Sequence, residues 1–320
     1  MRIVFMGTPE FAVESLDKLI KSGFEISAVV TVPDKPAGRG LTLKKSAVKI
    51  YAEKNNLSVL QPVRLKDQDF LAQLKTYSAD LFVVVAFRML PEEVWQIPSK
   101  GTINLHASLL PQYRGAAPIN WAIMKGEKIT GITTFFIDQE IDMGRIIYFE
   151  EVPVESHYNA GILHDVLMKK GAALLSKTVE AIKKNDHPVF SQSEFISPEM
   201  ELKTAPKLTR ENCKIDWLLK IEGIQNQVRG LSPYPAAWTI IKNTETGEEL
   251  TLKIFSTEII DGRHASEPGE CITDTKSYLY FTADGGLLSI LELQPEGRRQ
   301  MSIKEFLRGF RGINNWKIKV

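Results

Sequence analysis

Along residues 1–189, segments with short runs of apolar residues alternate with segments in which apolar residues recur every three or four positions. Short apolar runs predict the strands of a buried sheet, and apolar residues three or four positions apart predict helices between them. The expected strands are 3–6, 26–32, 81–86, 102–106, 132–137 and 146–152, and the expected helices are 10–22, 46–55, 67–77, 119–124 and 160–183. This alternation predicts a Rossmann-like, doubly wound α/β domain.

The pattern changes after residue 189. Residues 190–207 show no consistent period and are rich in Ser and Pro, which predicts a linker. Residues 208–320 hold short strand-like runs separated by Gly-containing turns. The expected strands there are 237–241, 250–259, 278–282 and 287–294, and the expected helices are 221–229 and 303–310. Several short strands in one small segment predict a second, OB-like β-barrel domain.

Composition narrows the class of protein. A chain of 320 residues suits about two domains. Two cysteines are too few for a disulfide framework or a metal cluster, so we expect both to be unpaired. No apolar run approaches the ~18 residues of a membrane helix, and the first run ends early, at Gly7, unlike a signal peptide. We therefore expect a monomeric cytoplasmic protein without a membrane partner.

One strand end carries unusual chemistry. In the segment from Ile103 to Ser108, apolar residues alternate with Asn104, His106 and Ser108, so these three share one side. Asp142 follows in a later loop. An amide, an imidazole and a carboxylate make a proton-handling set without a nucleophile, which suits acyl transfer in which the substrate itself attacks. The alternative is structural, with an amide that caps the strand and a buried histidine.

Two other segments bear on ligand class. The first βα turn, Met6-Gly7-Thr8-Pro9, lacks the Gly-x-Gly-x-x-Gly pattern, and Pro9 removes a backbone N–H, which disfavours a dinucleotide. Net charge is only +1, but residues 33–49 are basic and place Arg39 between two glycines, and residues 298–320 are also basic. These runs are either solvated surface or parts of a site for a phosphate-rich partner.

Together these segments closely resemble the methionyl-tRNA formyltransferases, a branch of the formyltransferases that use 10-formyltetrahydrofolate. The resemblance covers nearly the whole chain and is carried by 33–49, 104–118, Asp142 with Gly144, 207–209, 215–217 and 229–235. The chain departs from the family pattern at Phe87-Arg88, Ala107, Met143 and Arg145.

The resemblance implies the following roles. The enzyme would transfer a formyl group from 10-formyltetrahydrofolate to initiator methionyl-tRNA without a metal. Its catalytic residues would be Asn104, His106 and Asp142. The folate-binding residues would be Phe87, Arg88, Leu90, Ser108, Leu109, Leu110, Pro111, Ile137 and Asp138. The tRNA-binding residues would be Arg39, Lys44, Lys45, Lys203, Lys207 and Arg210.

Three other functions remain open from the sequence. A formyltransferase that acts on an amino-sugar nucleotide would share the chemistry of the first domain. A formyl-folate hydrolase would use the same trio but typically carries an extra N-terminal domain. A non-catalytic RNA-binding protein would leave Asn104, His106 and Asp142 unexplained.

Overall fold

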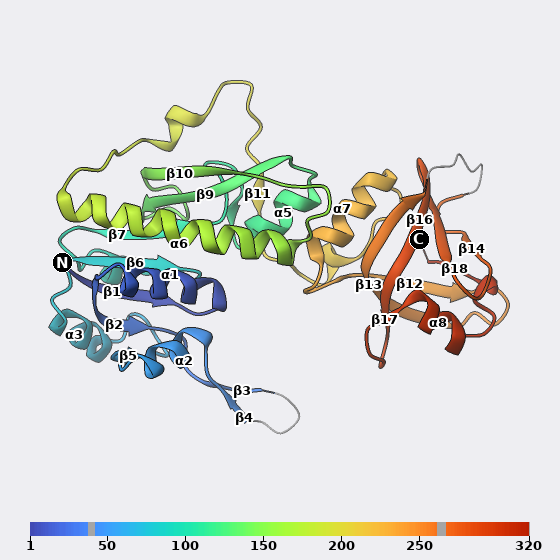
Figure 1. The fold of residues 1–320 in the computed structure, drawn as a ribbon, viewed down its shortest axis with the longest axis horizontal. Helices are drawn as coiled ribbons and strands as arrows, with labels where there is room; N and C mark the ends of the chain where they lie inside the picture. The colour runs from blue at the N-terminus through green and yellow to red at the C-terminus, as the bar shows by residue number, and fades with distance from the viewer. Residues whose placement is uncertain (38–41, 261–266, 320) are drawn as a thin grey trace. The chain divides into compact units, whose positions relative to one another are not determined.

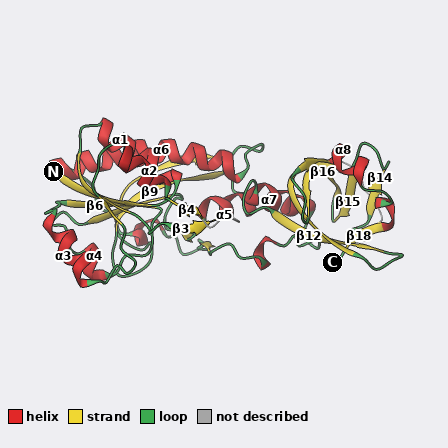
Figure 2. Cartoon of the chain, turned by 90° about the horizontal axis from the view of Figure 1, so that it is seen from below, coloured by secondary structure: helices red, strands yellow, loops and turns green. Residues whose placement is uncertain are grey.

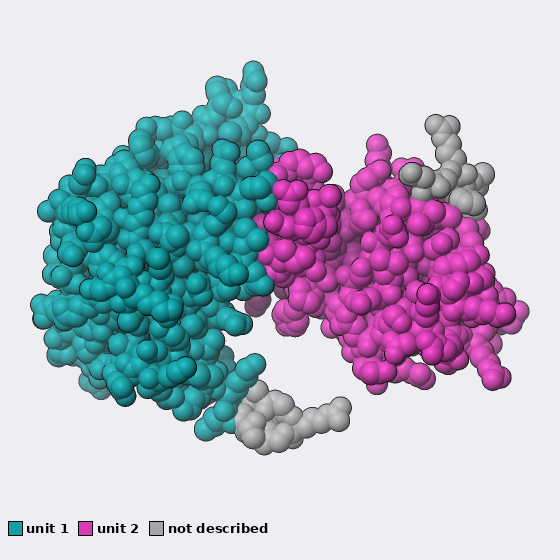
Figure 3. Space-filling view, in the orientation of Figure 1, with its two compact units in different colours: residues 1–118, 129–153, 164–205 teal, residues 119–128, 154–163, 206–320 magenta. Residues whose placement is uncertain are grey.

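The computed structural model describes residues 1–37, 42–260 and 267–319. The chain divides into two compact units, coloured separately in Figure 3. Unit 1 comprises Met1–Pro118, Ile129–Pro153 and His164–Ala205, and unit 2 comprises Ile119–Lys128, Val154–Leu163 and Pro206–Val320. Most of the segment expected to be a linker therefore lies in unit 1.

Unit 1 is built on a seven-stranded sheet in the order β10-β9-β7-β6-β1-β2-β5. The strands are β1 (Arg2–Gly7), β2 (Glu25–Val30), β5 (Val59–Leu60), β6 (Leu81–Val85), β7 (Thr102–His106), β9 (Ile129–Phe136) and β10 (Ile146–Pro153). Strands β7, β6, β1, β2 and β5 are parallel, and β9 and β10 are antiparallel. The chain winds in opposite directions from β1 and β6, which confirms the Rossmann-like fold and puts the ligand-binding switch point between these strands.

Helices cover both faces of this sheet (Figures 1 and 2). They are α1 (Glu10–Lys21), α2 (Ala47–Lys54), α3 (Gln68–Thr76), α4 (Glu92–Trp95) and α6 (Ala160–Lys184). Helices α1 and α6 lie on one side and α3 and α4 on the other. Side chains cap three helix starts: Ser46 accepts from Lys49 N before α2, Asp67 accepts from Asp69 N and Phe70 N before α3, and Asn159 accepts from Ile162 N before α6.

The alternation along β7 decides which way its polar residues face. A Cβ atom on Gly171 of α6 would lie 2.9 Å from Leu105, so α6 packs closely on the face that Leu105 occupies. Asn104 pairs with Val84, whose side chain belongs to the cluster under α3 and α4. Asn104 and His106 therefore face away from α6, and they share one side of the strand as the sequence pattern predicts.

Three short pairings in unit 1 were not predicted from the sequence, and the first of them joins β5 to β2. The basic segment forms a hairpin of β3 (Lys35–Ala37) and β4 (Thr42–Lys44), and Arg39 lies outside the described residues. Strand β8 (Arg114–Gly115) pairs with β11 (Thr204–Ala205). Part of the expected linker is therefore hydrogen-bonded to the loop that follows β7. Strands of two or three residues carry too little periodicity to be predicted locally.

Unit 2 contains an antiparallel sheet in the order β14-β15-β16-β13-β12-β18, with β17 on β16. The strands are β12 (Ala237–Asn243), β13 (Glu249–Ile260), β14 (Cys271–Thr273), β15 (Leu279–Ala283), β16 (Gly286–Pro295), β17 (Met301–Ser302) and β18 (Trp316–Ile318). Because Ile318 N donates to Gly269 O just before β14, the two ends of the sheet meet and nearly close a barrel. This agrees with the expected barrel, although β14, β17 and β18 were not predicted.

Helices and aromatic side chains fill this barrel unit. Helix α7 (Ile221–Leu231) buries Ile224 and Val228 in its core, and α8 (Ile303–Gly309) buries Phe306. Trp217 lies in the same core and donates its indole N–H to Thr239 Oγ1 at 2.9 Å. Helix α5 (Pro118–Met124) belongs mostly to this unit.

Both cysteines are unpaired, as the sequence predicts. Within the described ranges, no helix is long and apolar enough to span a membrane.

Candidate active site

The carboxyl edge of the parallel sheet gathers three strained residues. Ala86 follows β6 with φ 46°, Tyr113 follows β7 with φ 59°, and Asp142 lies in the loop after β9 with φ 55°. Left-handed backbone in a residue other than glycine costs on the order of 1–3 kcal/mol and is concentrated at functional sites. Asp142 tolerates this conformation best of the three because short polar side chains hydrogen-bond locally.

His106 and Asp142 approach one another at this edge. His106 is 6% exposed, and its Nε2 lies 2.9 Å from Tyr113 O. Its Nδ1 lies 3.8 Å from Asp142 Oδ2, which accepts a hydrogen bond from Gly115 N at 3.0 Å. The two groups that the sequence singled out from distant segments are therefore neighbours, and the backbone of Tyr113 and Gly115 orients both.

Asn104 completes the polar side of β7. It is partly buried and, within the described ranges, its side-chain amide makes no hydrogen bond to the protein. Both ring nitrogens of His106 already face protein oxygens. The Asn104 amide is consequently the donor of this trio that can bind a ligand without giving up an internal partner.

Sequence reasoning missed Gln192, Arg114, Tyr113 and Gly115 at this site. Gln192 Nε2 donates to Asp142 O at 2.8 Å and to Gly144 O at 2.9 Å, so it holds the loop that carries Asp142. Gly115 adopts φ 125°, and a Cβ there would meet Ala205 O at 2.5 Å. The Pro-Gly-Pro spacing of this loop indicated order in advance, whereas no local pattern distinguished Gln192 in its Ser- and Pro-rich segment.

Part of the expected folate set lies together. Leu90 is buried in the cluster beneath α3 and α4, and Phe87 and Ile137 pack against the same cluster. Arg88 donates to Pro62 O at 2.8 Å and to Val63 O at 3.1 Å, and lies over the Phe87 ring at 5.3 Å. Burial lowers the pKa of the Arg88 guanidinium from its usual value.

The run from Ser108 to Pro111 is placed differently. Ser108 Oγ donates to Gln112 O at 2.6 Å, and Leu110 packs with Phe135 and Ile146 in another cluster. Leu109 contacts Gly131, where a Cβ would lie 2.4 Å from its side chain. Asp138 is exposed and accepts from Glu140 N at 3.1 Å. Leu110 therefore does not pack in the cluster beneath α3 and α4 that Phe87 contacts.

Two buried polar atoms beside the switch point lack a partner within the described residues. They are Thr8 Oγ1, just after β1, and Arg88 Nε, after β6. Buried polar groups are nearly always hydrogen-bonded, to protein, water or ligand. Their position at the carboxyl ends of β1 and β6 is where a doubly wound sheet binds its ligand.

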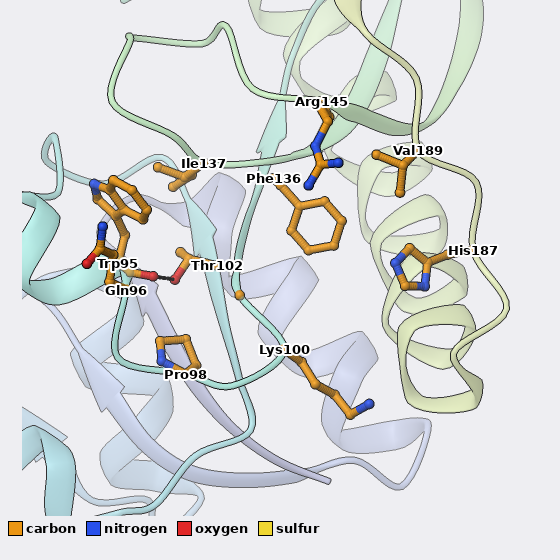
Figure 4. A pocket seen from close by; sticks show the side chains of 11 residues that line it. Trp95, Gln96, Pro98, Lys100, Thr102, Phe136, Ile137, Arg145, His187 and Val189 are labelled. Atoms are coloured by element: carbon orange, nitrogen blue, oxygen red, sulfur yellow. Dashed lines mark hydrogen bonds between the residues drawn. The ribbon is translucent and has the colours of Figure 1, made fainter.

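A cavity of about 530 Å³ lies at the opposite end of β7. Figure 4 shows Thr102, the first residue of β7, on its wall together with Phe136, Ile137 and His187. His106, the last residue of β7, does not line it. Ile137 is the only member of the expected folate set along this cavity, so the cavity is separate from the Asn-His-Asp site.

The described basic residues expected to contact tRNA occupy varied environments. Lys44 and Lys207 are exposed, and Lys45 donates to Glu53 at 2.7 Å, a hydrogen bond that raises the pKa of Lys45. Arg210 lies 5.0 Å over the Trp238 ring in unit 2. Lys203 O accepts from Tyr113 N at 2.7 Å, which ties this residue to the His106 loop. No group of three metal-binding side chains occurs among the described residues.

A Rossmann-like unit with this trio at its carboxyl edge, followed by a small barrel unit, defines a two-domain formyltransferase architecture. The formyl transferase family model matches residues 1–179, and the model for the formyl transferase C-terminal domain matches residues 207–311. The chain is 49% identical over 309 residues to a methionyl-tRNA formyltransferase of Flavobacterium johnsoniae, covering 97% of this chain and 96% of that one. It is 47% identical over 319 residues to that of Bacteroides fragilis, covering 100% and 98%. The chain belongs to the methionyl-tRNA formyltransferase family.

Solved structures of lower identity share the fold. An N-formyltransferase from Helicobacter canadensis, in complex with folinic acid and dTDP-3-aminofucose, matches with a TM-score of 0.63 at 19% identity, covering 90% of this chain and 98% of that one. HypX from Aquifex aeolicus, in complex with tetrahydrofolic acid, matches with a TM-score of 0.63 at 20% identity, covering 98% of this chain and 48% of that one.

Proposed function

We propose that this enzyme transfers the formyl group of 10-formyltetrahydrofolate to the α-amine of initiator methionyl-tRNA. The observation that carries the proposal is the meeting of His106 and Asp142, with Asn104 on the same strand, in a chain of this family. The arrangement offers donors and a proton acceptor but no nucleophile, which fits direct attack by the amine. We place the reaction in the cytoplasm and assign it to a monomer.

The residues divide the chemistry as follows. The methionyl amine attacks the formyl carbon, and the tetrahedral intermediate carries an oxyanion that accepts a hydrogen bond from the Asn104 amide. The imidazolium of His106 stabilises the same charge. Asp142 takes the proton from the attacking nitrogen, and N10 of the folate receives this proton as the bond to the formyl carbon breaks. The products are formyl-methionyl-tRNA and tetrahydrofolate.

The folate is proposed to lie at the switch point between β1 and β6. Phe87 and Leu90 supply apolar surface. Thr8 Oγ1 and Arg88 Nε are buried polar atoms without a hydrogen-bond partner among the described residues, and each can bind the ligand. Pockets of this kind combine an apolar lining with a few oriented polar groups.

Thermal unfolding tests this folate site. A stable analogue such as 5-formyltetrahydrofolate at about 100 times its Kd should stabilise the fold by about 2.7 kcal/mol, which raises Tm by several degrees. An unchanged Tm at saturating analogue would contradict the proposal and favour an RNA-binding protein without folate chemistry.

Arg39 is proposed to contact the tRNA backbone. We expect Arg39→Ala to raise KM for methionyl-tRNA while KM for the folate stays within twofold, and to reduce the slope of log KM against log salt by about one. Steady-state kinetics at three salt concentrations measure both effects. Lys54→Ala, an exposed lysine at the end of α2, is the matched control and should change neither KM. Equal changes in both KM values for Arg39→Ala would remove this role.

A further inference from the structure

Gln192 is a polar side chain that the fold buries almost completely. It is 4% exposed and begins the short 3-10 helix Gln192–Phe195, whose start is fixed by a capping box between Ser191 and Glu194. Its amide makes four hydrogen bonds: Nε2 donates to Asp142 O and Gly144 O, and Oε1 accepts from Arg114 Nε at 3.0 Å and Nη2 at 2.6 Å. Both N–H groups and both oxygen lone pairs are used.

These bonds close a ring around Asp142. Gln192 holds the backbone carbonyl of Asp142, and the same amide binds the side chain of Arg114. The next residue, Gly115, donates its backbone N–H to the Asp142 carboxylate at 3.0 Å. Both the backbone and the carboxylate of Asp142 are therefore anchored to one connected set of residues, although its φ of 55° is otherwise disfavoured.

Only a carboxamide in the observed orientation satisfies this ring. A carboxylate at this position would still accept from the Arg114 guanidinium, but its second oxygen would face two carbonyl oxygens. An apolar side chain of similar size would leave two carbonyls and a guanidinium without their partner, and unsatisfied buried groups are costly. The loop would then shift to find new partners.

We propose that Gln192 is a positioning residue for formyl transfer, because it sets where the Asp142 carboxylate lies relative to His106 Nδ1, now 3.8 Å away. The proposal rests on the catalytic roles assigned above to His106 and Asp142. Gln192 acts through Asp142, so its loss should lower kcat rather than raise KM. A shift of about 1 Å in a catalytic group can cost as much as about 100-fold in rate.

Two variants separate positioning from space filling. We expect Gln192→Leu and Gln192→Glu each to lower kcat at least tenfold, with both KM values within twofold of wild type. Gln192→Glu keeps the size and the acceptor for Arg114, so near-normal kcat in this variant would overturn the proposal even if Gln192→Leu failed to fold. Circular dichroism and Tm report whether each variant is folded.

Gln227 provides the matched control. It is also buried and also holds a loop, since its Nε2 donates to Lys214 O at 2.8 Å, but it lies in unit 2. We expect Gln227→Leu to lower Tm and leave kcat at saturating methionyl-tRNA within twofold. An equal loss of kcat in Gln227→Leu would mean that loss of any buried glutamine suffices, which contradicts a specific role for Gln192.

A spectroscopic readout follows the same contact without turnover. In protein labelled with ¹⁵N-histidine, Gln192→Glu should shift the ring resonances of His106, assigned through His106→Ala, and leave those of the half-buried His164 on α6 in place. If His106→Ala is inactive while both Gln192 variants keep kcat and the His106 resonances, the positioning role is wrong and the proposed function stands. If His106→Ala is active, the catalytic role of His106 fails and the role of Gln192 fails with it, whereas the proposed function fails only if wild type transfers no formyl group to methionyl-tRNA.

Discussion

Replacing His106 with alanine should lower kcat for formyl transfer at least tenfold while the folate still binds, and Asp142→Ala should do the same. General acid–base groups contribute roughly 10²–10⁴ in rate, and each oxyanion donor roughly 10²–10³. The two residues lie 3.8 Å apart and act on the same tetrahedral intermediate, so the double variant should lose far less than the product of the single losses. Single-turnover kinetics and titration of a folate analogue separate the chemical step from binding.

A second His-Asp pair in the same chain provides the control. His164 Nδ1 lies 3.0 Å from Asp165 Oδ1, closer than the pair at the proposed site, but on α6, where the His164 ring packs against Phe11 of α1. His164→Ala and Asp165→Ala should keep kcat within twofold. Near-normal turnover in purified His106→Ala would contradict the catalytic assignment of His106. The imidazole of His164 lies elsewhere in the chain and cannot replace that of His106.

Gly144→Ala should also inactivate the enzyme, because the Asp142 loop has no room for a methyl group there. A Cβ on Gly144 would lie 1.6 Å from Phe136 O, which is backbone and cannot rotate aside. Phe136 N also donates to Arg145 O at 2.9 Å, so the two ends of the loop must move together or separate. We expect a loss of roughly 1–3 kcal/mol in the free energy of unfolding and at least a tenfold lower kcat. Thermal unfolding and steady-state kinetics measure the two effects.

Gly309→Ala is the control for this prediction. Gly309 ends α8, and a Cβ there would meet no atom within 4 Å. The Tm and kcat of the Gly309→Ala variant should match those of wild type. Normal kcat in Gly144→Ala would show that the loop can move without loss of function, which contradicts the strict placement of Asp142.

The elements that a local pattern encodes were predicted closely. Strand β7 has the predicted bounds, Thr102–His106, because its alternation is unbroken, and α6 extends one residue beyond its expected end. Apolar runs predicted six of the seven strands of the first sheet, including the pair near its edge, but not the two-residue β5 or the antiparallel direction of β9 and β10. Strands such as β17 and β18 exist only through pairing with distant partners, so two or three residues gave no signal of their own.

The residues of the candidate site also divide into those that a local pattern predicts and those that depend on distant contacts. Asn104 and His106 stood out because polar residues on a buried strand are rare, and Asp142 was predicted as an acid in a later loop that completes their set, a role that the family resemblance also implied. Gln192 could not be found, since its contacts lie 50 residues back at Asp142 and 78 back at Arg114. Hydrogen bonds over such separations depend on the tertiary fold, which a local pattern does not contain.

The most direct test of the central claim is formyl transfer from 10-formyltetrahydrofolate labelled in the formyl carbon, with methionyl-tRNA and an amino-sugar nucleotide assayed in parallel. We expect labelled formyl-methionyl-tRNA with wild type, no product with the sugar nucleotide, and at least a tenfold lower rate with His106→Ala. Product with the sugar nucleotide alone, or none with either acceptor, would contradict the assignment.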